Sequence, residues 1–108
     1  MIPKIHKLKL REAVDFFQKS KRYYSRYFLV FYRHKKNEES RMVVVVPKKN
    51  IKLRVKRSEI KRQIYNFSLP LIKKIQGVEI VLVVNKEIAT VKKENIIEDL
   101  ENIFSKVN

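Results

Sequence analysis

RMVVVVPKKNIKLRVKRSEIKR, residues 41–62, places an apolar segment directly before the most basic part of the chain. Residues 41–47 are almost continuously apolar, which predicts a strand buried on both faces. Pro47 ends this strand because proline cannot donate to a ladder. From Lys48 to Arg62, eight of fifteen residues are Lys or Arg, and Glu59 is the only acid. Apolar residues are spaced through this segment, whereas a disordered charge run would lack such anchors, so we expect a folded basic surface.

Positive charge is concentrated in the same part of the chain. The formal net charge is +15 over 108 residues: residues 1–66 hold 20 Lys or Arg against 5 acids, whereas residues 67–108 hold 6 of each. A field concentrated in this way steers polyanions, so nucleic acid and an anionic membrane surface are the candidate partners. The length and a hydrophobic fraction of 44% fit one hydrophobic core, and we expect residues 1–108 to form a single domain.

The elements before this stretch are predicted from their periodicity. Residues 10–20 carry apolar side chains at helical spacing, which predicts a short amphipathic helix. Residues 26–33 are dense in aromatic and β-branched residues and predict a strand, followed by a polar hairpin loop over residues 34–40. Residues 41–47 would then return beside that strand.

A helix, a strand and a second helix are predicted after the basic segment. The apolar face of the first helix consists of Ile60, Ile64, Phe67 and Leu71. Pro70 is expected to break or restart this helix, and Gly77, the only glycine, to cap its C-terminus. Residues 78–84 predict a strand and residues 96–104 a closing helix, with Thr90 near its start. This order of elements predicts an α/β or α+β fold.

A catalytic site made of protein side chains is hard to assemble. His6 and His34 are the only histidines, and both are expected to be exposed imidazoles. The carboxylates Glu98, Asp99 and Glu101 lie on a helix whose other face is apolar, which favours a solvated face over a metal or acid–base cluster. One glycine rules out a Gly-rich phosphate loop, and the absence of cysteine rules out disulfides and thiolate metal sites.

The lengths of the apolar runs indicate where in the cell the protein is expected. The longest of them are the length of strands, and the N-terminus has no apolar core of signal-peptide length. We therefore expect a soluble, cytoplasmic protein.

Aromatic residues gather in the first third of the chain among Arg22, Arg26 and Arg33. They are Tyr23, Tyr24, Tyr27, Phe28, Phe31 and Tyr32. Aromatic rings in a basic groove are typical of single-strand binding, although core packing is the commoner use of such residues. Strand alternation would send one set of side chains to one face and a second set to the other, namely Tyr27, Leu29 and Phe31 against Phe28, Val30 and Tyr32. One face is then expected to be core and the other a ligand groove.

Residues 41–62 resemble the signature of the bacterial ribonuclease P protein component. In that family a strand ending in Lys-Lys is followed by a basic segment and a helix of the Arg-Asn-Arg-x-Lys-Arg type. Phe17, nine residues before an Arg26 that opens an aromatic strand, is similar to the family's first helix and strand. IIEDLENIF, residues 96–104, is similar to its last helix.

The resemblance implies a fold like the second domain of small-subunit ribosomal protein S5. This is an α+β sandwich with helices packed on a sheet of about four strands, in the order α-β-β-β-α-β-α, with an unusual left-handed βαβ crossover. It also implies an RNA-binding subunit of a ribonucleoprotein endoribonuclease that removes the 5′ leader of precursor tRNA. The RNA would perform the hydrolysis with divalent metal, Mg²⁺, and the protein would contribute no catalytic residue.

The implied partners are the catalytic RNA and precursor tRNA, with no membrane. The catalytic RNA would be bound by Lys48, Lys52, Arg54, Lys56, Arg57, Ser58, Lys61 and Arg62. The leader would lie in a cleft between the first helix and the sheet, lined by Phe17, Arg26, Leu29, Phe31 and Lys49.

The chain departs from the family signature at its centre, because Arg-Asn-Arg is replaced by Arg57, Ser58 and Glu59. Ser58 could be an N-cap with Glu59 in the first turn, where the helix dipole favours an acid. Alternatively, Glu59 could pair with Arg62 three residues on.

Two other classes of protein remain as alternatives. A ribosomal or RNA-assembly protein would use the same basic segment to bind structured RNA but would need no leader groove. A protein attracted to anionic lipid is disfavoured because no single helix pairs a basic face with a broad exposed apolar one.

Overall fold

The computed structural model describes residues 6–9 and 16–107, without the side chains of residues 36–38. The elements along the chain are α1 (Phe16–Lys19), β1 (Lys21–Tyr24), β2 (Phe28–Glu39), β3 (Arg41–Val45), α2 (Arg54–Ile72), β4 (Gln76–Val84), the 3₁₀ helix η3 (Lys86–Thr90) and α3 (Lys93–Val107). The fold is mixed α+β with a four-stranded sheet, as the resemblance to the family implies. Residues 10–15 of the predicted first helix lie outside the described residues, and α1 is the part that is described.

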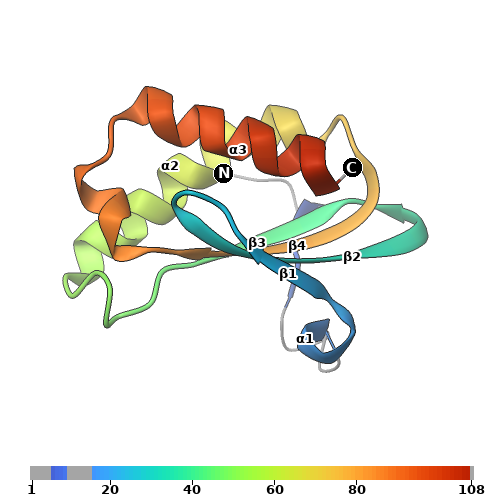
Figure 1. Cartoon of the computed structure of the whole chain (residues 1–108), viewed down its shortest axis with the longest axis horizontal. Helices are drawn as coiled ribbons and strands as arrows, with labels where there is room; N and C mark the ends of the chain where they lie inside the picture. Colours follow the sequence, from blue (N-terminus) through green and yellow to red (C-terminus); the bar gives the residue numbers. More distant parts are fainter. Residues whose placement is uncertain (1–5, 10–15, 108) are drawn as a thin grey trace.

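The strands lie in the order β1-β2-β4-β3. β1 and β2 form an antiparallel hairpin, and β4 is antiparallel to β2 but parallel to β3. Helix α2 connects the parallel pair β3 and β4, so these three elements form the implied βαβ unit. Figure 1 shows α2 and α3 together on one face of the sheet and the short α1 on the other.

Helices α2 and α3 close one face of the sheet, called here the helix face. Six strand residues that point towards the helices are each at most 1% exposed: Phe28, Val30, Met42, Val44, Ile80 and Leu82. From the helices, Ile64, Ile72, Leu100 and Ile103 are buried against them. The stripe predicted for α2 lies on this side, with Ile64 buried and its other members half-buried. This face therefore holds the main hydrophobic core.

The other face, called here the open face, has a smaller apolar cluster. Leu8, Phe16 and Val81 are buried there, and Phe31, Val43, Val45 and Val83 are half-buried around them. Alternation along β2 and β4 explains the division, because neighbouring residues of a strand point to opposite faces.

The predicted hairpin between residues 26–33 and 41–47 is wrong. β2 continues through the polar residues up to Glu39, the chain reverses at Ser40, and β4 lies between β2 and β3. β4 occupies the central position, and its residues 78–82 are all buried, as suits a strand with a partner on each side. The hairpin partner of β2 is instead β1, which the sequence reasoning did not predict.

Pro70 and Gly77 also differ from expectation. Helix α2 runs through Pro70, which lies in the last turn, and ends two residues later with Lys73 as the C-cap in the right-handed helical region. Gly77 lies in β4 and does not cap the helix. Its φ is 69°, and a Cβ atom added there would lie 2.9 Å from the carbonyl oxygen of Lys35, so a side chain at this position meets backbone.

Candidate nucleic-acid interface

Exposed cationic side chains occupy the start of α2 and the loop before it. They are Lys48, Lys49, Lys52, Arg54, Lys56, Lys61 and Arg62, and together they are called the basic surface. The first turn of α2 contains no acid that would offset them. Ser58 is exposed in the second turn of the same helix. The structure therefore brings the predicted catalytic-RNA residues onto one helix end and its adjoining loop.

Arg57 differs from its neighbours because its guanidinium is used inside the protein. Its Nη1 donates to the carbonyl oxygens of Ile51 at 3.0 Å and Lys52 at 2.7 Å. Ile51 is buried, and the side-chain amide of Asn50 donates to the carbonyl oxygen of Val84 at 2.9 Å. These contacts fix the loop that carries the lysines, so Arg57 acts at least partly by positioning other charges.

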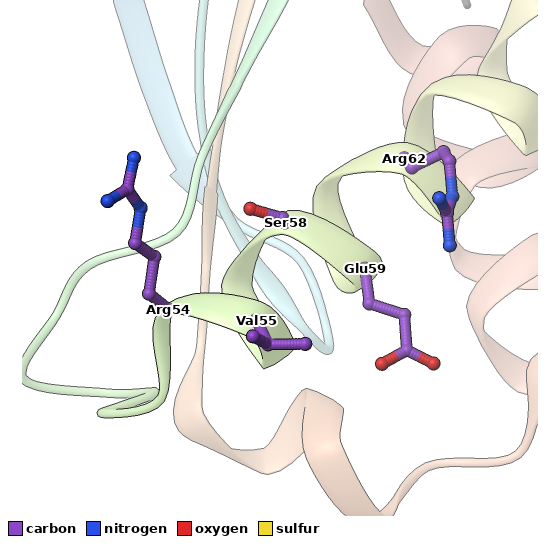
Figure 2. Close-up of a pocket in the computed structure, with 5 residues that line it drawn as sticks. All are labelled: Arg54, Val55, Ser58, Glu59 and Arg62. Atoms are coloured by element: carbon purple, nitrogen blue, oxygen red, sulfur yellow. The ribbon is translucent and has the colours of Figure 1, made fainter.

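Neither interpretation of Ser58 and Glu59 agrees with the structure. The N-cap of α2 is Leu53, which makes no side-chain capping bond, so Ser58 lies inside the helix and the capping prediction is wrong. Glu59 and Arg62 are both described, and they form no ion pair with each other. Figure 2 shows the Glu59 side chain extending from α2 between Val55 and Arg62.

Two shallow hollows flank Arg54 and Ser58 on the surface of α2. One of about 310 Å³ is lined by Arg54, Val55, Ser58, Glu59 and Arg62 (Figure 2), and one of about 200 Å³ by Val46, Arg54, Arg57, Ser58 and Lys61. Leu53 and Val55 are 68% and 79% exposed beside the charges. The basic surface thus combines cations with apolar side chains that sugars or bases could contact.

An aromatic pair lies on the open face of the sheet. The ring centroids of Phe17 and Phe31 are 5.0 Å apart with the rings nearly perpendicular, and Phe17 is 50% exposed. Leu29 lies two residues before Phe31 in β2 and points to the same face. Three of the predicted leader-cleft residues are therefore on one face.

Arg26 and Lys49 lie elsewhere. Arg26 is in the turn between β1 and β2, and its guanidinium carbon is 5.4 Å from the centre of the Tyr27 ring. Tyr27 was predicted to share a face with Leu29 and Phe31, but it precedes β2 and is buried in the helix-face core. Lys49 is exposed in the turn after β3, as part of the basic surface.

A partly buried ion pair helps to seat α1 on the open face. Nε of Arg33 donates to Oε1 of Glu79 at 2.7 Å, and the Arg33 guanidinium carbon lies 5.1 Å from the centre of the Phe16 ring. Glu79 is also the register partner of Arg41 in β3, whose buried Nε has no hydrogen-bond partner. Because Phe16 adjoins Phe17, this cluster places the exposed ring above Phe31. Sequence reasoning missed it because the two strands that supply Arg33 and Glu79 were not expected to pair.

Two titratable groups expected at the surface are buried instead. His6 is buried, and its Nδ1 lies 2.8 Å from the carbonyl oxygen of Ser40. Asp99 is 8% exposed and accepts hydrogen bonds from the backbone N–H of Tyr27 at 3.0 Å and from Oγ of Ser25 at 2.9 Å. The exposed-surface predictions for these two residues are wrong because turns distant in sequence supply their partners. His34, Glu98 and Glu101 are exposed as predicted.

Tyrosines tie the helices to the sheet. The phenol oxygen of Tyr65 in α2 accepts from the Val44 backbone N–H at 3.0 Å, and burial raises the pKa of Tyr65 although this bond opposes the shift. Nζ of Lys106 in α3 lies 4.1 Å from the centre of the Tyr23 ring in β1. Burial, with smaller effects from Asp99 and Tyr32, raises the pKa of Tyr23 to about 12. These groups stay neutral at physiological pH and serve the packing of the helix face.

The described part of the chain contains neither a group of metal ligands nor a helix that could span a membrane. Its His, Asp and Glu side chains form no group of three or more that could hold a metal ion. Among the same residues, none of the helices combines the length and apolar character needed to cross a bilayer.

Fold and charge together define a small basic α+β protein of the nucleic-acid-binding class. The family description Ribonuclease P matches residues 2–108, and the chain belongs to this family. It is accordingly a protein component of ribonuclease P, whose family acts in tRNA processing and binds RNA.

Solved structures of this family have the same fold. The RNase P protein from Thermotoga maritima in complex with 1-(4-fluorophenyl)-2-thiourea has a TM-score of 0.80 and 24% identity over 94% of this chain and 100% of that chain. A second T. maritima structure has a TM-score of 0.73 and 26% identity over 94% and 97%. The Staphylococcus aureus RNase P protein has a TM-score of 0.80 and 22% identity over 96% and 98%. No curated protein sequence matches the chain significantly.

Proposed function

We propose that this chain binds the catalytic RNA of ribonuclease P through the basic surface and holds the 5′ leader of precursor tRNA on the open face. The observation that carries the proposal is the half-exposed Phe17–Phe31 pair, because aromatic rings beside cations bind single strands without requiring a particular sequence. Lys49 and its neighbours lie in the loop that follows β3, so the two surfaces are joined through one strand.

Charge neutralisation is the main physical task in this proposal. Catalytic RNA and precursor tRNA are both polyanions, and each phosphate contacted by Lys or Arg releases condensed counterions. The net charge of +15 provides for contacts to both molecules. Arg57 contributes by holding the loop that presents Lys52. In this proposal its remaining guanidinium nitrogens donate to phosphate.

The chemistry belongs to the RNA in this proposal, together with the Mg²⁺ that the RNA binds. The two buried carboxylates of the described chain do not fit a metal role, because Glu79 accepts from Arg33 and Asp99 accepts from the β1–β2 turn. The protein's contribution is to bind and orient the leader and to lower the repulsion between the two RNAs.

Reconstitution tests this function. Full-length protein is combined with a bacterial ribonuclease P RNA at low magnesium, and precursor-tRNA cleavage and precursor affinity are measured with and without the protein. We expect the protein to restore cleavage and to increase affinity for precursor tRNA more than for mature tRNA, which has no leader. Protein alone, freed of nucleases, should cleave neither RNA.

The contrary outcomes identify the alternatives. Binding of structured RNA with equal affinity for precursor and mature tRNA would favour an RNA-assembly protein. Cleavage by the protein alone that a point substitution abolishes would refute catalysis by the RNA.

A further inference from the structure

Tyr24 is an exposed aromatic residue that the proposed function leaves without a role. It is 77% exposed at the end of β1, whereas the other tyrosines of the β1–β2 region are buried or half-buried. A single exposed aromatic on a protein surface is ordinary. Two features distinguish Tyr24 from an ordinary exposed aromatic residue: it lies on the open face, and the hairpin that carries it is held rigidly.

The position of Tyr24 follows from the strand registers. Across the sheet, Tyr24 pairs with Leu29, Leu29 with Val83, and Val83 with Val45, so these four residues form one row on the open face. Phe31 lies in the next row, about 7 Å away along β2. The row ends at β3, where the chain enters the loop of Lys48 and Lys49, and three strand spacings separate Tyr24 from that end, about 14 Å.

The turn after Tyr24 is held rigidly from the helix face. Asp99 of α3 accepts from Oγ of Ser25 at 2.9 Å and from the backbone N–H groups of Tyr27 at 3.0 Å and Arg26 at 3.4 Å. The backbone N–H of Ser25 donates to the carbonyl oxygen of Phe28 at 2.8 Å. A buried carboxylate is stable when its lone pairs are satisfied in this way, and it fixes the hairpin that presents the exposed ring.

We propose that Tyr24 is a second stacking platform for single-stranded RNA, and that Asp99 is the residue that positions it. The inference rests on the proposed function and extends it along the leader. The basic surface adjoins the β3 end of the row and Tyr24 lies at the β1 end, one strand beyond Phe31. If the catalytic RNA on the basic surface holds the cleavage site, the base on Tyr24 is farther from that site than the base on Phe31. Arg22, exposed on the same strand and opposite Phe31, supplies a cation beside this path.

Leader length provides the test in the reconstituted holoenzyme. Affinity is measured for precursors whose leaders are lengthened one nucleotide at a time, with Tyr24→Ala, with Tyr24→Leu, which keeps an apolar side chain but no ring, and with the matched control Tyr24→Phe. We expect both ring-less variants to bind long-leader precursors about 5- to 150-fold more weakly, the range for loss of one stacked base. Tyr24→Phe should match the wild type, and the defect should begin at a longer leader than that of Phe31→Ala.

The same variants separate failure of the inference from failure of the proposed function. If Phe31→Ala weakens leader binding and Tyr24→Ala and Tyr24→Leu do not, the role of Tyr24 is refuted and the leader groove stands. An equal loss for precursor and mature tRNA in the Tyr24 variants also refutes it. If the wild-type protein fails to distinguish precursor from mature tRNA, the proposed function itself is wrong.

A fluorescence measurement gives an independent readout, because the chain contains no tryptophan. In Tyr24→Trp, an oligonucleotide with the leader sequence should quench the indole, whereas in Asn102→Trp, a control at an exposed position of α3, it should not. Adding Asp99→Asn to Tyr24→Trp should reduce the quenching while circular dichroism stays that of a folded protein. Unchanged indole emission in Tyr24→Trp at saturating oligonucleotide would refute stacking.

Discussion

The two faces of the sheet are built from the same strands but are finished differently. On the helix face, α2 and α3 cover alternate side chains of β4, which are fully buried in the main core: Val78, Ile80, Leu82 and Val84. On the open face, Val43, Val45 and Val83 stay half-buried, and the Phe17 ring above Phe31 is half-exposed. Full burial stabilises the fold but leaves no surface for a ligand. Partial burial leaves ring faces that a base can cover, at the cost of a smaller contribution to stability.

β2 allows the two faces to be compared with a single substitution type. Phe28 and Phe31 are three residues apart and point to opposite faces, with Phe28 1% exposed and Phe31 half-buried. Phe28→Ala removes a fully buried ring, so the free energy of unfolding should fall by about 3–5 kcal/mol. Urea unfolding followed by circular dichroism measures this. A loss for Phe28→Ala no larger than that for Phe31→Ala would break the comparison.

Phe31→Ala should instead show its main effect in binding. The variant should lose at most about 2 kcal/mol of stability, because the ring is only partly buried. Leader-bearing precursor should bind the holoenzyme about 5- to 150-fold more weakly, whereas mature tRNA should bind almost unchanged. Equilibrium binding to both tRNAs gives the measurement. Equal losses for the two tRNAs in a folded variant would assign Phe31 to the fold or to general RNA binding.

Charged residues on α2 can be compared in the same way. The Lys61 side chain is exposed, so Lys61→Ala should reduce the slope of log affinity against log salt by about 0.9 for one phosphate of duplex RNA. Arg57 also bonds the Ile51 and Lys52 carbonyl oxygens, so Arg57→Ala should lower affinity for the catalytic RNA more than Lys61→Ala does. Binding at several salt concentrations compares the variants. Identical affinities and slopes in both would show that the internal bonds of Arg57 have no effect on binding.

The smallest effect concerns Tyr23, at the edge of the helix face. Its pKa is raised from 10.0 to about 12 in the folded protein. Below pH 10 the phenol is protonated in both states and adds no pH dependence. Between pH 10 and 12 the unfolded chain releases this proton while the folded chain keeps it, so the free energy of unfolding falls as pH rises. Tyr23→Phe should show a shallower fall over this interval, measured by urea unfolding, and equal slopes would contradict the assigned burial.

Local sequence pattern predicted the elements whose signals are strong and continuous. Residues 78–84, the stripe around Ile64 and the closing helix appear where the periodicity placed them. β1 could not be predicted because KRYY is short and largely polar, and it becomes a strand only through its ladder with β2. The hairpin prediction failed because the choice between β3 and β4 as the partner of β2 depends on contacts about fifty residues apart along the chain.

The parts of the candidate site that could be predicted are those marked by residue type, namely clustered basic residues and clustered aromatic residues. The basic segment gathers onto α2 and its loop, and Phe17 meets Phe31. Contacts such as Asp99 with the β1–β2 turn, or Arg33 with Glu79, join residues 46 or more positions apart and leave no local pattern. Helical spacing wrongly placed Asp99 on a solvated face, because it could not show that backbone N–H groups of a distant turn would enclose the carboxylate.

The central position of β4 has a consequence for the biosynthesis of the protein. β4 lies between β2 and β3, so the sheet cannot close until residues 76–84 have left the ribosome. By that time residues 1–66, which hold the whole positive excess, have already been made. The nascent chain is therefore a strongly cationic, unfolded segment beside ribosomal RNA before its core exists. β4 is the last strand to be synthesised, so its insertion between β2 and β3 completes the sheet on which the basic surface becomes ordered.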